Sequence, residues 1–141
     1  MNVSALIKIG ELARASGLSA DTIRFYESKG LLTPKGRTQS GYRQFTTADI
    51  QRLQFIQRAK SVGFTLDEIS ELMALRLHPQ GHTCEEVKQR TERKLQTVNE
   101  KLAELNRIRA SLELLSAACD GGDKSAQQCS ILRLLDSSES L

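Results

Sequence analysis

Three cysteines are the side chains of this sequence with the most versatile chemistry. They stand at Cys84, Cys119 and Cys129, and the last two enclose a nine-residue loop. That spacing is longer than a zinc-ribbon knuckle, so the pair alone is a weak metal motif. An odd number of cysteines in a chain without a visible signal peptide argues against a framework of disulfides. Metal ligation, a reactive thiol and ordinary burial all remain open.

The segment between the first two cysteines predicts one long helix. From Glu85 to Ala118 nothing interrupts helix formation, and apolar residues recur at steps of three or four. They are Leu95, Val98, Leu102, Leu105, Ile108, Leu112 and Leu115. Such a narrow apolar stripe is typical of a coiled coil, so we expect the helix to pair with a second copy of the chain. The alternative is a helix packed along its own domain.

Helix geometry determines which cysteines can meet. At about 1.5 Å per residue, Cys84 and Cys119 lie on the order of 50 Å apart within one chain, so they cannot share an ion there. In an antiparallel pair, the start of one helix meets the end of the other. Cys84 then lies beside Cys119 and Cys129 of the partner subunit, which gives two equivalent three-thiolate sites. The alternative for Cys84 is an incidental, reactive thiol near a helix N-terminus.

The thiolate set favours a soft or borderline cation. Zn²⁺ prefers four ligands, so Asp120, Asp123, His82 or water would complete its coordination. Pb²⁺, Cd²⁺ and Hg²⁺ accept sulfur-rich sites with fewer ligands. For His82 we favour a hydrogen-bonding role beside the ligands, or at the start of the helix, over direct ligation.

The basic charge of the chain is concentrated in its first half. Residues 1–60 carry 10 basic and 4 acidic side chains, a net charge of +6. Residues 61–141 carry 10 basic and 13 acidic side chains, a net charge of −3, so the net charge of the whole chain is only +3. This asymmetry predicts that the first half binds a polyanion, although a chance distribution of solvated charge is the alternative.

A helix-turn-helix is predicted within that basic half. Ile7 to Ser16 has the apolar spacing of a short helix that ends at Gly17. Ser19 is a good N-cap for a second helix, which Lys29-Gly30 should end. Two short helices around a glycine turn are typical of this DNA-binding motif.

Further elements follow the second helix. The segment Gln39–Phe45 predicts a tight turn and a short strand, which would form a wing beside the helices. Thr47 is expected to cap a third helix. Thr65 and Glu68 match a capping box for a fourth. The expected fold is therefore mainly α: a winged helix-turn-helix, a long antiparallel coiled-coil helix, and a C-terminal metal-binding loop with a short helix.

Several polar side chains of the basic half could contact DNA. The start of the second helix of such a motif enters the major groove, where arginine reads guanine or grips phosphate. A second basic and aromatic cluster lies on the predicted wing, and the third helix adds two cations. The candidates are Ser19, Thr22, Arg24, Tyr26, Arg37, Tyr42, Arg43, Arg58 and Lys60. The alternative is that Tyr26, Tyr42 and Phe45 are core aromatics and the cations are merely solvated.

Length and composition limit the class of protein. The chain has 141 residues, of which 4% are aromatic and 26% charged, and no apolar run is long enough to span a membrane. We therefore expect a cytoplasmic protein without a membrane partner. The expected domains are 1–76 for DNA binding, 77–84 as a connector, 85–118 for dimerisation, and 119–141 for the metal loop and short helix.

Five motifs together resemble the MerR family of dimeric bacterial transcription regulators. They are Ile9-Gly10-Glu11-Leu12-Ala13, Thr22-Ile23-Arg24-Phe25-Tyr26-Glu27, Gly30-Leu31-Leu32, Gly41-Tyr42-Arg43 and Gly63-Phe64-Thr65-Leu66-Asp67-Glu68-Ile69. The segments His82-Thr83-Cys84 and Cys129-Ser130-Ile131-Leu132 are most similar to the zinc-responsive (ZntR-type) branch.

The resemblance implies a metal-responsive activator. It implies that Cys84, Cys119 and Cys129 are ligands across an antiparallel homodimer, and that Arg24, Tyr26, Arg37, Tyr42 and Arg43 meet promoter DNA. It also implies that bound metal lets RNA polymerase engage a distorted promoter of metal-export genes. Copper-type members typically have a serine at Cys84. Asp120 and Lys124 replace a second cysteine and a histidine of zinc-type members, which favours a single ion, Zn²⁺ before Cd²⁺ or Pb²⁺.

Two other classes of protein are alternatives to a metal-responsive regulator. A thiol-redox sensor built on Cys119 and Cys129 predicts a disulfide on mild oxidation, but these residues do not form a C-x-x-C pair. A metal storage or delivery protein leaves the basic helix-turn-helix unexplained. No pairing of nucleophile and base is visible, so we do not expect an enzyme.

Overall fold

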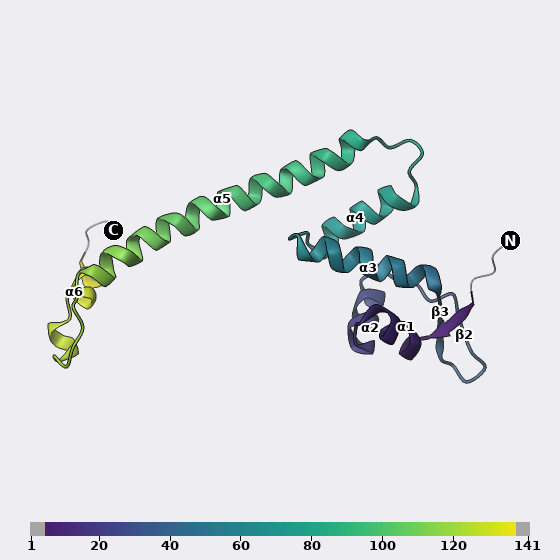
Figure 1. The fold of residues 1–141 in the computed structure, drawn as a ribbon, viewed down its shortest axis with the longest axis horizontal. Helices are drawn as coiled ribbons and strands as arrows, with labels where there is room; N and C mark the ends of the chain where they lie inside the picture. The colour runs from purple at the N-terminus through teal and green to yellow at the C-terminus, as the bar shows by residue number, and fades with distance from the viewer. Residues whose placement is uncertain (1–4, 138–141) are drawn as a thin grey trace. The chain divides into compact units, whose positions relative to one another are not determined.

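The computed structural model describes residues 5–137 and is mainly helical, with helices α1 to α6 and a small sheet (Figure 1). The chain divides into two compact units, one extending to Gln89 and the other beginning at Arg90. No helix among the described residues is both long enough and apolar enough to cross a membrane. The mainly helical architecture expected from the sequence is confirmed.

Helices α1 (Ile9–Ser16) and α2 (Ala20–Ser28) form the predicted helix-turn-helix. Gly17 ends α1 with a φ of 75°, a left-handed conformation that glycine adopts without strain. The hydroxyl of Ser19 accepts the N–H of Thr22 at 3.1 Å, so the predicted cap of α2 is confirmed. The prediction for Ile7 was wrong, because this residue lies in a strand that pairs with another part of the chain.

A three-stranded antiparallel sheet accompanies these helices, in the order β1-β3-β2. Its strands are β1 (Leu6–Lys8), β2 (Gly36–Arg37) and β3 (Arg43–Thr46). Ile7 lies opposite Phe45, and Arg37 lies opposite Arg43. The predicted wing strand is thus confirmed as β3, and Figure 1 shows the loop between β2 and β3 extending away from the helices.

A buried carboxylate fixes the start of α3 (Thr47–Ser61). Asp49 is 1% exposed, and its Oδ2 accepts the backbone N–H of Thr46 at 2.9 Å and the hydroxyl of Thr46 at 3.4 Å. Its Oδ1 lies 3.6 Å from Nη1 of Arg52. The cap is therefore Thr46 and not Thr47, because Asp49 reaches back to the residue that ends β3.

The next helix begins as the sequence predicts. At the start of α4 (Leu66–Leu77), the carboxylate of Glu68 accepts the N–H of Thr65 at 2.9 Å, and the hydroxyl of Thr65 accepts the N–H of Glu68 at 3.2 Å. One apolar cluster then packs the elements of the first unit together. It consists of Leu12, Ile23, Tyr26, Leu31, Leu32, Phe45, Leu53, Ile56, Ala59, Ile69 and Met73.

The predicted long helix is confirmed as α5 (Cys84–Ala117), which is continuous over 34 residues. At its start, Thr83 and Glu86 exchange hydrogen bonds of 3.2 and 3.3 Å in a second reciprocal cap. Leu95, Val98, Leu102, Leu105, Ile108 and Leu112 remain 39–60% exposed, whereas Leu115 is buried. We call these six exposed residues the apolar stripe. The described chain continues through η1 (Ala126–Gln128) and α6 (Ser130–Asp136), and Figure 1 shows α6 beside the last turns of α5.

Replacing Asp49 should destabilise the first unit. We expect Asp49→Ala to lower the free energy of unfolding by about 1–3 kcal/mol, since it removes the carboxylate that holds Thr46 at the start of α3 and leaves half-buried donors without an acceptor. Urea unfolding followed by circular dichroism measures this. Asp67→Asn, at an exposed site in the first turn of α4, is the matched control and should change it by less than about 1 kcal/mol. Equal effects of the two substitutions would contradict the role given to Asp49.

Candidate nucleic-acid interface and metal centre

Helix α2 carries three of the candidate DNA contacts near its start. Ser19 caps the helix, and its hydroxyl also lies 2.9 Å from the hydroxyl of Thr22. Arg24 is exposed, and its Nη1 lies 3.0 Å from the carboxylate of Asp21. This pair joins neighbouring turns of one helix at the surface, so it leaves the guanidinium in contact with solvent.

Tyr26, Tyr42 and Phe45, three aromatic residues of the basic half, have different environments. Tyr26 is only 3% exposed and Phe45 is fully buried, which supports the core role weighed for them in the sequence. The ring of Tyr26 lies 6.0 Å from that of Phe25, and the ammonium group of Lys60 lies 5.7 Å from its centroid. Tyr42, by contrast, is 61% exposed. Of the two tyrosines proposed to meet DNA, only Tyr42 presents most of its ring to solvent.

The wing brings cations together around Tyr42. The Nη1 of Arg37 donates to the carbonyl of Gly41 at 3.0 Å, and the Nε of Arg43 donates to Oε1 of Glu27 at 2.9 Å. The ammonium group of Lys8 lies 5.2 Å from the centroid of the Tyr42 ring, a cation–π contact. The sequence analysis did not identify Lys8 and Glu27 as part of this surface. Each contacts a residue that is distant in the sequence, and no local spacing signals such a contact.

Arg58 and Lys60 lie together in the last turn of α3, and both are exposed. Cations at this position interact favourably with the negative end of the helix dipole, so they stabilise α3 as well as adding positive charge. All nine candidate DNA contacts therefore belong to the first unit, and eight of them, all but Tyr26, are exposed or half-buried.

Cys119 and Cys129 lie close together in the second unit. Both are half-buried and line one pocket of about 390 Å³, together with the loop between them and the start of α6. The backbone N–H groups of Leu132 and Ile131, with a smaller contribution from the thiol of Cys119, lower the pKa of Cys129, against an opposing effect of burial. A lowered pKa favours the thiolate, which is the form that binds metal.

The loop between these cysteines reverses direction at two glycines. Gly121 and Gly122 have φ values of 81° and 95°, which other residues rarely adopt. The N–H of Gly121 lies 3.4 Å from the sulfur of Cys119. Asp120 and Asp123, the expected additional ligands, are exposed on this loop. Asp120 lines the same pocket as the two cysteines, and a pair of thiols suits a borderline cation such as Zn²⁺.

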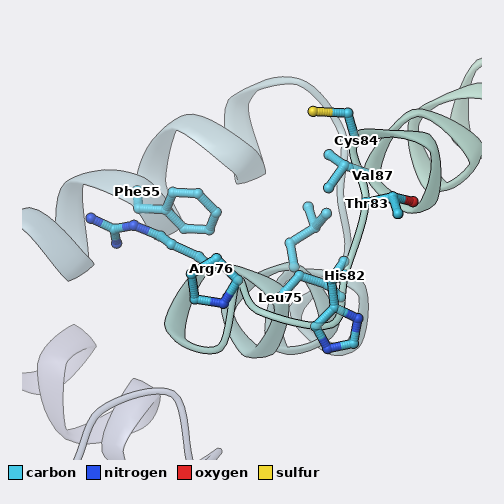
Figure 2. Close-up of a pocket in the computed structure, with 9 residues that line it drawn as sticks. Phe55, Leu75, Arg76, His82, Thr83, Cys84 and Val87 are labelled. Atoms are coloured by element: carbon cyan, nitrogen blue, oxygen red, sulfur yellow. The ribbon is translucent and has the colours of Figure 1, made fainter.

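Cys84 lies at the other end of α5, as its exposed first residue. It borders an apolar pocket of about 280 Å³ in the first unit, where Figure 2 shows Phe55 of α3, Leu75 of α4 and Val87 of α5 around it. His82 lies just before α5, with its Nδ1 2.8 Å from the carboxylate of Glu86, a geometry that suits a role at the helix start. Among residues 5–137, no group of three or more His, Cys, Asp or Glu side chains converges on one point.

Comparison with known proteins matches nearly the whole chain. Residues 7–76 match the family model described as MerR HTH family regulatory protein, and residues 50–115 match the model described as MerR, DNA binding. The HTH-type transcriptional regulator ZntR of Escherichia coli (strain K12) is 41% identical over 131 residues, which cover 93% of each chain.

Solved structures agree with these matches. The transcription regulator PbrR691 from Ralstonia metallidurans CH34, in complex with lead(II), superposes with a TM-score of 0.84 at 35% identity, over 92% of this chain and 98% of that one. HiNmlR, a MerR family regulator bound to promoter DNA, gives a TM-score of 0.54 at 32% identity, over 81% and 86% of the two chains. The chain therefore belongs to the MerR family of helix-turn-helix transcription regulators, which are not enzymes.

Proposed function

We propose that this protein is a homodimeric, metal-responsive activator of transcription. Its favoured effector is Zn²⁺, and the alternatives are Cd²⁺ and Pb²⁺. Sulfur ligands with nearby carboxylates suit these borderline and soft ions. The similarity to a regulator solved with lead(II) supports a divalent effector, and the presence of Cys84 favours a third thiolate.

Each part of the chain has a role in this proposal. Residues 1–76 bind promoter DNA, and residues 77–84 connect this part to the long helix. Residues 85–118 form the dimerisation helix, and residues 119–141 contain the metal-binding loop and the short C-terminal helix. The nine candidate contacts, from Ser19 to Lys60, supply the DNA-binding surface. The burial of Tyr26 makes it the weakest member of that set. HiNmlR was solved in complex with promoter DNA, and the similarity to it supports a DNA-binding role for residues 1–76.

One observation carries the proposal for the metal centre. Cys119 and Cys129 border one pocket just after the end of α5, whereas Cys84 is the first residue of the same helix. The apolar stripe between them is exposed in one chain and needs a partner. Antiparallel pairing of two α5 helices buries both stripes and brings Cys84 beside Cys119 and Cys129 of the partner subunit.

The mechanism follows from this shared site. Cys84 of one subunit and Cys119 and Cys129 of the other would hold the metal ion, which would stabilise the contact between the two subunits. The loop from Cys119 to Cys129 would then become ordered against the start of α5 of the partner subunit. The change would pass to the DNA-binding surface through α4, to which this proposal assigns the role of a hinge. The two surfaces bend and untwist a palindromic operator, so that RNA polymerase can engage two promoter elements that are otherwise too far apart. Such deformation costs about 1–6 kcal/mol, which metal binding can supply.

Removing the cross-subunit thiolate should abolish induction by divalent ions. We expect Cys84→Ser to lose at least about tenfold in run-off transcription with Zn²⁺, Cd²⁺ or Pb²⁺, because one of three soft ligands is lost. The template is a promoter in which the spacer between the two polymerase-binding elements is lengthened. This spacer carries an operator that the wild-type protein has selected from random DNA. Cu⁺ is assayed in parallel to test the choice of metal.

The control for this experiment lies on the same helix. Gln89→Ser changes an exposed residue of α5 that takes no part in the site, and it should retain induction. Full induction of Cys84→Ser by all three divalent ions would exclude the shared site. Induction by a mild oxidant without any metal would instead identify a thiol-redox sensor.

Removing a cation from the wing should weaken DNA binding and make the remaining affinity less sensitive to salt concentration. We expect Arg37→Gln to lower affinity for the selected operator and to reduce the slope of log K against log salt by about 1, as loss of one phosphate contact requires. Lys101→Gln, an exposed charge change on α5, is the control and should keep the wild-type slope. Mobility-shift titrations between low and high salt measure both. An unchanged slope for Arg37→Gln would remove this residue from the interface.

A further inference from the structure

An ion pair joins α2, the second helix of the helix-turn-helix, which we call the recognition helix, to the wing strand β3. The Nε of Arg43 on β3 lies 2.9 Å from Oε1 of Glu27 on α2, although 16 residues separate them in the chain. The two side chains are only 34% and 20% exposed. Because the pair connects two different elements and is largely shielded from water, it can fix their relative positions more firmly than a surface pair can.

The second oxygen of Glu27 makes this pair unusual. In the part of the chain that the structure describes, Oε2 of Glu27 is buried and has no hydrogen-bond partner. A buried carboxylate oxygen without a partner destabilises the fold. The Glu27 carboxylate therefore lowers the stability of the folded state through Oε2, and the ion pair of Oε1 with Arg43 must offset this loss.

We propose that Glu27 is a positioning residue for DNA binding. It holds the Nε side of the Arg43 guanidinium, so that the terminal Nη groups remain available to donate to a backbone phosphate. It thereby fixes the wing relative to α2, which enters the major groove. This inference rests on the proposed function, because it assigns a role within the proposed DNA-binding surface.

Whether replacement of Glu27 weakens or strengthens DNA binding distinguishes a positioning role from a purely electrostatic one. Glu27 places a negative charge next to a phosphate-binding cation, so its removal should strengthen DNA binding if only charge matters. If Glu27 positions Arg43, its removal should weaken binding even though the protein becomes more positive. Asp21 offers a matched comparison: it pairs with Arg24 on the same helix, but this pair is exposed and stays within one element.

The experiment compares four variants on the duplex selected from random DNA by the wild-type protein. We expect Arg43→Gln to weaken binding about tenfold and to lower the salt slope by about 1. Glu27→Gln should weaken binding by about 3-fold or more, whereas Asp21→Asn should bind at least as tightly as wild type. The double variant Glu27→Gln/Arg43→Gln should bind no more weakly than Arg43→Gln alone, because Glu27 acts through Arg43.

Each outcome decides the inference. Tighter binding by Glu27→Gln, or additive losses in the double variant, would overturn it while leaving the proposed function intact if Arg43→Gln still weakens binding. Failure to select any duplex would overturn the inference together with the proposed function. If circular dichroism shows that Glu27→Gln does not fold, Glu27→Asp replaces it, since this variant keeps the charge but shortens the reach to Arg43. Wild-type affinity of Glu27→Asp would then overturn the inference.

Discussion

The exposed apolar stripe of α5 is the constraint on which the proposed assembly depends. A helix of 34 residues with one narrow apolar face leaves Leu95, Leu102 and Leu105 in contact with water in a single chain. Full burial of an exposed leucine contributes about 1.5–3 kcal/mol, and each of these half-exposed side chains would gain part of that on pairing, so their sum favours a second copy. The antiparallel arrangement that we propose would bury the stripe and also bring together thiols from opposite ends of the helix. In this proposal, dimerisation and metal sensing depend on one physical interaction.

The DNA-binding unit relies on a different kind of interaction. Its helices are short, so their stability comes from packing and caps more than from helix propensity. The buried Asp49 joins the end of β3 to the start of α3, and Phe45 anchors the same strand in the core. The wing is thus held at its base by buried groups, whereas its loop remains free to meet a ligand.

Local signals in the sequence predicted much of this fold. Ser19 and Thr65 are caps whose hydrogen bonds involve residues three positions away, so spacing alone reveals them. Contacts between distant segments could not be predicted in this way. Ile7 has helical spacing but pairs with Phe45, and Tyr26 has the chemistry of a phosphate contact but packs in the core. In the candidate site, the loop between Cys119 and Cys129 was predictable from their spacing, whereas the pocket that they share and the link between Glu27 and Arg43 were not.

The position of Cys84 suggests how a metal signal could reach DNA. Cys84 borders a pocket that also contains Phe55 of α3 and Arg76 of α4, and the guanidinium of Arg76 lies 5.0 Å from the ring of Phe55 (Figure 2). Helix α3 in turn contributes Leu53 and Ile56 to the core that holds α1 and α2. A ligand held at Cys84 would therefore act on a pocket whose walls come from α3 and α4, and the path to DNA in this proposal runs from that pocket through the close-packed core, which transmits small displacements. In the proposed mechanism this path needs no contact between metal and DNA, because the same apolar core supports both the hinge and the recognition helix.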